Sequence, residues 1–123
     1  MTDKKTILCV DDEVDILELF QDELEDNQFN VIKATSGNEG IEVFKKNKID
    51  CIISHIRMPD GDGVYLVKSL KELGASVPMF LVTGFSDYTS EELAGLGVNA
   101  IIFKPFDLEE VVQMVANSLD KAS

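Results

Sequence analysis

The chain alternates from end to end between short, continuous apolar runs and longer segments in which apolar residues recur with helical spacing. The runs, such as Cys51-Ile52-Ile53, lack the regular polar positions of a strand that has one face in water. Strands of this kind are buried on both faces, which is typical of a parallel sheet covered by helices. We expect strands at residues 6–10, 29–33, 50–54, 78–82 and 100–103.

The segments between these runs are amphipathic. In the first, Ile16, Phe20 and Leu24 recur at every fourth position beside acidic residues. The second opens at Ser36 with Glu39 three positions later, a capping-box pattern. Further helices are expected after the turn at 60–63, over 90–96 and from residue 107 onward. Repeated strand–helix alternation predicts an α/β doubly wound fold with helices on both faces of the sheet, and 123 residues suit a single domain over 1–123.

The charge balance limits the partners of such a domain. With 11 Lys and Arg against 23 Asp and Glu, the net charge is −12, which disfavours binding to nucleic acid or to an anionic membrane. No apolar run approaches the ~20 residues of a membrane helix, and acidic residues appear too early for a signal peptide. We therefore expect a cytoplasmic protein, monomeric or weakly dimeric, in which Cys9 and Cys51 are buried, reduced thiols.

Polar residues with chemical potential follow the predicted strands. Asp11 and Asp12 come after the first strand, and the third, fourth and fifth strands are followed by His55, Thr83 and Lys104. Because functional crevices in such folds lie at the carboxyl ends of the strands, we expect these side chains at one edge of the sheet. Taken singly they have simpler interpretations, since the two aspartates could cap a helix and the histidine could be an ordinary strand-end residue.

The glycine-rich segment 60–63 is interpreted as a turn. It resembles a calcium loop only in its first residues, because no glutamate closes it.

Four motifs in this order, VDDE, IRMPDGDG, LVTG and FKPF, closely resemble those of the response-regulator receiver domain of two-component signalling, over essentially the whole chain. The resemblance implies a flavodoxin-like, three-layer fold with five parallel strands in the order 2-1-3-4-5. It also implies that Asp12 ligates Mg²⁺ directly, that Asp11 acts mostly through water and that the Arg57 carbonyl is a further ligand. Thr83 would bind a phosphoryl oxygen as a switch, and Lys104, before a cis Pro105, would pair with another.

The chain departs from the family at the residue two positions before Arg57-Met58-Pro59. The family has its phosphoacceptor aspartate there, and this chain has His55. An acyl phosphate requires a carboxylate, so this departure predicts loss of the usual phosphorylation and weak or absent Mg²⁺ binding. The aromatic residue that the family commonly has three positions before the lysine is Ile101 here, and Phe103 is expected in the core.

Three interpretations follow. The first is a receiver-like module, not an enzyme, that acts by binding a sensor histidine kinase or a downstream signalling protein, with its helix at 90–96 and the helix after Pro105 as the partner surface. The second is an ordinary phospho-accepting regulator that carries an Asp-to-His substitution. The third is a sensor of divalent transition metals that uses Asp11, Asp12 and His55, because mixed nitrogen and oxygen sites suit such ions.

Overall fold

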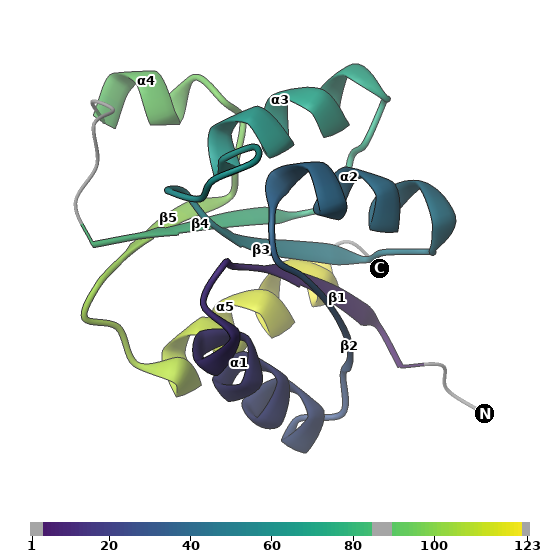
Figure 1. Ribbon diagram of the computed structural model, residues 1–123. Coiled ribbons are helices and arrows are strands. Elements are labelled where there is room, and N and C mark those ends of the chain that lie inside the picture. Colours follow the sequence, from purple (N-terminus) through teal and green to yellow (C-terminus); the bar gives the residue numbers. More distant parts are fainter. Residues whose placement is uncertain (1–3, 85–89, 122–123) are drawn as a thin grey trace.

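The computed structural model of the protein describes residues 4–84 and 90–121, in which five strands alternate with five helices (Figure 1). The elements are β1 (Thr6–Val10), α1 (Val14–Asp26), β2 (Asn30–Ala34), α2 (Gly37–Lys46), β3 (Cys51–His55), α3 (Gly63–Glu72), β4 (Met79–Thr83), α4 (Ser90–Ala94), β5 (Ala100–Phe103) and α5 (Leu108–Lys121). All strand pairs are parallel, in the order β2-β1-β3-β4-β5. The predicted flavodoxin-like α/β fold and its strand order are confirmed.

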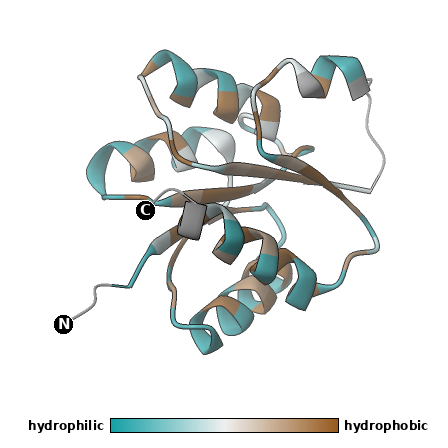
Figure 2. Ribbon diagram, turned by 180° about the vertical axis from the view of Figure 1, so that it is seen from behind, coloured by the Kyte–Doolittle hydropathy of each residue, from teal (hydrophilic) through white to brown (hydrophobic). Residues whose placement is uncertain are grey.

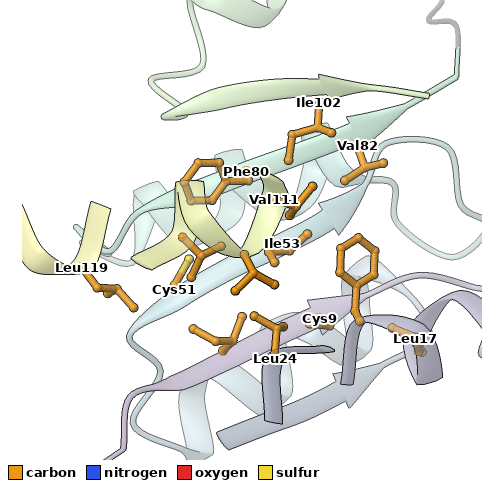
Figure 3. Close-up of a cluster of buried hydrophobic side chains, with 14 residues drawn as sticks. Cys9, Leu17, Leu24, Cys51, Ile53, Phe80, Val82, Ile102, Val111 and Leu119 are labelled. Atoms are coloured by element: carbon orange, nitrogen blue, oxygen red, sulfur yellow. The ribbon is translucent and has the colours of Figure 1, made fainter. Parts of the chain in front are cut away.

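The sheet separates two hydrophobic layers. Helices α1 and α5 cover one face, where Leu17, Leu24 and Val111 pack against strand residues such as Cys9 and Ile53 (Figure 3). Helices α2, α3 and α4 lie on the other face, which has its own buried cluster. The central strands are the most hydrophobic elements and the helices turn polar residues outward (Figure 2). This burial on both sides explains why the strands read as continuous apolar runs.

Three strands begin one residue later than the sequence indicated, namely β2, β3 and β4. The start of β4 has a simple cause, because Pro78 has no N–H and only its carbonyl joins the sheet, accepting from Ile52 N at 3.0 Å. The same three strands also end one residue later, so His55 and Thr83 are the last residues of β3 and β4 rather than the residues that follow them.

Local side-chain bonds define several helix starts. Ser36 caps α2 by accepting from Glu39 N at 3.0 Å, as the capping-box pattern predicts. The reciprocal bond differs by one residue, since the Glu39 carboxylate accepts from the backbone N–H of Thr35. Asp62 caps α3 through Tyr65 N, and Asp107 accepts from Glu109 N where α5 begins.

Phe103 corrects an expectation. It is 56% exposed and therefore not part of the core. Phe103 lies on the edge strand β5, two residues after Ile101. Because side chains alternate along a strand, it lies on the same side of the sheet as Ile101. Ile101 packs against the buried cluster on the face covered by α2, α3 and α4. At the end of the strand Phe103 lies opposite Thr83 in the β4–β5 register.

Most of the remaining sequence expectations about the scaffold agree with the structure, and the end of one helix does not. Cys9 and Cys51 are free and buried, and burial raises the pKa of the Cys51 thiol to about 12 and that of Cys9 beyond the usual range. The Lys104–Pro105 peptide bond is cis. The helix expected at 90–96 ends earlier, at Ala94. No helix in the described part of the chain combines the length and apolarity that a membrane crossing requires.

Candidate functional site

The predicted residues meet at the carboxyl edge of the sheet. Asp11 directly follows β1, His55 and Thr83 end β3 and β4, and Lys104 directly follows β5. Because β1, β3, β4 and β5 are parallel neighbours in that order, their carboxyl ends lie along one edge. The sequence argument for a common edge is confirmed.

Asp11 is the buried carboxylate of this edge, with only 4% of its surface exposed. Its Oδ1 accepts from Glu13 N at 2.9 Å, so it stabilises the turn into α1 without being the helix cap, which is Glu13. Burial raises the pKa of the Asp11 carboxyl, and the neighbouring Asp12 carboxylate raises it further. The Glu13 N–H and the charges of His55 and Lys104 act in the opposite direction. The buried carboxylate is therefore destabilised in its charged form.

Asp11, Asp12 and His55 form a cluster. One potential ligand atom from each lies within 4.8 Å of the others, and the three side chains range from buried through half-buried to exposed. Two carboxylates and an imidazole at this separation are close enough to share one ion. Within the described residues, these carboxylates and this imidazole form a group with the spacing of a metal site.

The imidazole of His55 is held by the backbone of the following loop. Its Nδ1 lies 2.9 Å from the Arg57 carbonyl oxygen. Because a carbonyl oxygen only accepts, Nδ1 carries a proton in this hydrogen bond. The carbonyl that the resemblance makes a Mg²⁺ ligand is therefore engaged by His55.

Thr83 and Lys104 flank this cluster on the other side of β3. Thr83 is buried, and its carbonyl accepts from Lys104 N at 2.9 Å, which ties the start of the β5–α5 connection to the end of β4. The Lys104 side chain is half-buried and close enough to lower the pKa of Asp11. Both residues therefore belong to the same carboxyl edge of the sheet as His55.

The loop between β3 and α3 is hydrogen-bonded to the start of α2, a feature that the sequence did not indicate. Gly37 N donates to Gly61 O at 2.7 Å, and the Asn38 side chain donates to Asp60 Oδ1 at 2.8 Å. Asp60 and Gly61 have positive φ angles of 57° and 94°, which confirms that this segment is a turn.

Gly63 is also part of the support of the site. A Cβ atom at this position would lie 2.5 Å from the carbonyl oxygen of His55, so only glycine allows this close approach. In the sequence, the glycines of the segment 60–63 were the signal that could have indicated this support. The residues that they contact lie in other elements, so the sequence does not identify these partners.

Comparisons with known proteins agree with this geometry. A family model described as the response regulator receiver domain matches residues 7–116. Response regulator MprA of Mycobacterium sp. (strain KMS) is 31% identical over 119 residues, which cover 95% of this chain and 51% of that protein. The transcriptional regulatory protein GlrR of Escherichia coli (strain K12) is 28% identical over 118 residues, 95% of this chain and 27% of that protein. The chain thus spans about half of one curated relative and about a quarter of the other.

Solved structures give the same picture. The CheY-like receiver domain protein from Methanospirillum hungatei JF-1 superposes with a TM-score of 0.88 at 26% identity, over 96% of this chain and 95% of that one. A receiver domain protein from Clostridium thermocellum gives a TM-score of 0.87 at 26% identity, over 96% of each chain.

Proposed function

Because the chain belongs to the response regulator receiver domain family, we propose that it is a signalling module that acts through protein–protein contacts without the usual phosphorylation. Receiver domains are signalling modules of two-component systems. In this chain the conformation would be set by something other than an aspartyl phosphate. The proposal includes no catalytic role for the domain.

The identity and the bonding of residue 55 carry this proposal. We place His55 at the phosphoacceptor position, because it ends β3 two residues before Arg57-Met58-Pro59. A phosphoryl group on an aspartate is held by a bond to a carboxylate oxygen, and imidazole has no such atom. Asp50 and Asp60 cannot replace it, because one precedes β3 and the other lies in the turn before α3.

Receiver domains bind Mg²⁺ through acidic residues, and the donors present here do not fit that ion. Mg²⁺ selects oxygen ligands in octahedral geometry. Asp11 and Asp12 remain, but the third carboxylate is absent and the Arg57 carbonyl accepts a hydrogen bond from His55 at 2.9 Å. We therefore assign this chain weak or absent Mg²⁺ binding, with Thr83 and Lys104 as the residues that would have met the phosphoryl oxygens.

The test compares the chain with its His55→Asp and His55→Asn variants after treatment with acetyl phosphate and Mg²⁺. Intact mass should show no phosphoryl adduct on the unmodified chain and a labile adduct on His55→Asp. His55→Asn is the matched control, because it has the shape of aspartate without a nucleophilic oxygen, and it should stay unlabelled.

Magnesium should also stabilise His55→Asp. Binding to the folded state alone, at a concentration about 100 times the dissociation constant, adds about 2.7 kcal/mol to the free energy of unfolding. Labelling of the unmodified chain would contradict the proposal. Labelling of His55→Asp alone leaves it intact and is also what an ordinary regulator with an Asp-to-His substitution would give. An unlabelled His55→Asp would limit the resemblance to the fold.

A second function, sensing of a divalent transition metal, is favoured by the cluster of Asp11, Asp12 and His55. An imidazole with two carboxylates suits Zn²⁺, Ni²⁺ or Cu²⁺ better than Mg²⁺. Ligating imidazoles usually donate their other N–H to a carbonyl or carboxylate, as His55 Nδ1 does to Arg57. The midpoint temperature of thermal unfolding, measured with Zn²⁺ and with Mg²⁺, distinguishes this function. A rise of this temperature with Zn²⁺ that His55→Asn abolishes would support it. Equal unfolding curves in Zn²⁺ for the unmodified chain and for His55→Asn would exclude it.

The partner in either case is proposed to be a sensor histidine kinase or a downstream signalling protein. The relatives named above include transcriptional regulators, but they are longer than this chain, whose net charge of −12 opposes contact with nucleic acid. The surface of α4 and α5 is proposed as the contact region. The exposed Phe103 on β5, the strand between these helices in the chain order, supports this choice, since exposed aromatic residues are enriched at interfaces.

A further inference from the structure

A cleft of about 370 Å³ lies between α1 and α5, which pack side by side on one face of the sheet (Figure 1). It shares no residue with the cluster of Asp11, Asp12 and His55. Its walls repeat one arrangement: α1 contributes Glu23 and, one turn later at its C-terminal end, Asn27, and α5 contributes Glu109 and, one turn later, Gln113. The ring of Phe29 and the side chain of Val112 supply its apolar surface.

Each amide group of this cleft already uses one of its two N–H donors. Asn27 Nδ2 donates to the backbone carbonyl of Glu23 at 2.8 Å, and Gln113 Nε2 donates to Asn117 Oδ1 at 3.0 Å. Each amide therefore keeps its carbonyl oxygen as an acceptor and one further N–H. The carboxylates of Glu23 and Glu109 only accept, so acceptor atoms outnumber donors among the side chains that line the cleft.

The charge of the cleft is also one-sided. Its lining side chains in the described part of the chain carry two negative charges and no positive one. The negative potential of the cleft is not offset by basic residues of α1, because no lysine or arginine occurs between Lys5 and Lys33. A ligand that complements this cleft must be cationic, rich in N–H donors and able to contact an aromatic ring.

We propose that the α1–α5 cleft binds an arginine side chain presented by a partner protein. A guanidinium group offers five N–H donors in a plane, which matches two carboxylates and two amide oxygens. Its flat face stacks on aromatic rings such as that of Phe29. A lysine ammonium is a compact, strongly hydrated charge with three donors and satisfies this cleft less well.

The test titrates the ¹⁵N-labelled chain with the peptide acetyl-Gly-Arg-Gly-amide and, separately, with its lysine counterpart. The arginine peptide should give saturable chemical-shift changes at the side-chain amides of Asn27 and Gln113 and at the backbone of Val112. The lysine peptide should bind at least about tenfold more weakly. The double variant E23Q/E109Q should lose at least about tenfold in affinity for the arginine peptide.

The matched control is E18Q/E110Q, which removes one exposed carboxylate from each of the same helices outside the cleft. It should bind the arginine peptide as the unmodified chain does. Equal weakening in the two double variants would overturn the proposal, because it would show general attraction to an acidic surface. Shifts that do not saturate, or that fall outside the cleft, would also overturn it. If E23Q/E109Q does not keep a folded spectrum, the single variants E23Q and E109Q decide by the same criterion.

Discussion

At the scale of the residue, Asp11 is an acid whose burial opposes its charge. Its pKa is raised by burial, so the folded chain binds the proton more tightly than the unfolded chain, whose aspartates titrate near ~3.9. The stability that this group contributes is therefore complete below that value and is lost as pH rises through the folded-state pKa. Asp11→Asn keeps an oxygen for Glu13 N and should raise the free energy of unfolding at neutral pH by about 1 kcal/mol.

Urea unfolding at a series of pH values measures this effect. The gain of Asp11→Asn should shrink toward zero at a pH below ~3.9, where the carboxyl is protonated in both states. Asp15→Asn is the control, because Asp15 is an exposed acid in the first turn of α1. At this position its negative charge interacts favourably with the helix dipole and stabilises the helix. Its replacement should not stabilise the chain. A gain for Asp11→Asn that persists unchanged in acid would contradict the assigned cause.

At the scale of the element, the hydrogen-bonded contact between α2 and the β3–α3 loop depends on the absence of a side chain at Gly37. A Cβ atom there would collide with the carbonyl group of Gly61, which also accepts the Gly37 N–H. Gly37→Ala should therefore lower the free energy of unfolding by about 1–3 kcal/mol, the usual range for overpacking. It should also accelerate amide hydrogen exchange at Asn38, whose N–H donates to Asp60 O.

Gly95→Ala gives the comparison for this helix–loop contact. A Cβ atom at Gly95 would lie 3.6 Å from its nearest neighbour, the Glu92 carbonyl oxygen, which is an ordinary contact. This variant should stay within about 0.5 kcal/mol of the unmodified chain. Equal stability of the two variants would show that the loop moves aside at little cost.

At the scale of the whole molecule, the net charge of −12 makes the folded state repel itself. The acids are concentrated, with nine of them between Asp11 and Asp26. Salt screens such repulsion, because the Debye length falls to about 10 Å at 0.1 M. Raising NaCl from about 10 mM to about 200 mM should therefore increase the free energy of unfolding, on the order of 1 kcal/mol.

Tetramethylammonium chloride separates screening from binding of sodium to the acidic cluster, because its bulky cation is a poor ligand for carboxylates. It should stabilise the chain as much as NaCl does. The variant E18Q/D22N, which removes two charges from α1, should show a smaller salt effect. A rise with NaCl alone would indicate specific ion binding instead.

The sequence by itself determined the class of fold and which chemistry-bearing residues lie at one edge of the sheet. Buried parallel strands must be apolar along their whole length, so the strand pattern is readable without partners, and chemistry-bearing residues at strand ends must share an edge. For the same reason Asp11, Asp12, His55, Thr83 and Lys104 could be placed at this edge in advance, and their roles stay predictions. The strand starts were wrong by one residue in β2, β3 and β4, since the start of a strand depends on bonds to a neighbour, such as that from Ile52 N to the Pro78 carbonyl.

Only the tertiary structure decided what surrounds these residues. Phe103 was expected in the core, and its exposure depends on β5 being the edge strand and on what packs beside it, which spacing within one segment does not encode. The hydrogen bond between His55 and Arg57, the contact of Gly37 with Gly61 and the cleft between Glu23 and Glu109 likewise depend on distances across elements. Periodicity and composition describe which face of an element is buried, whereas the partner that covers each face is set by how the elements pack together.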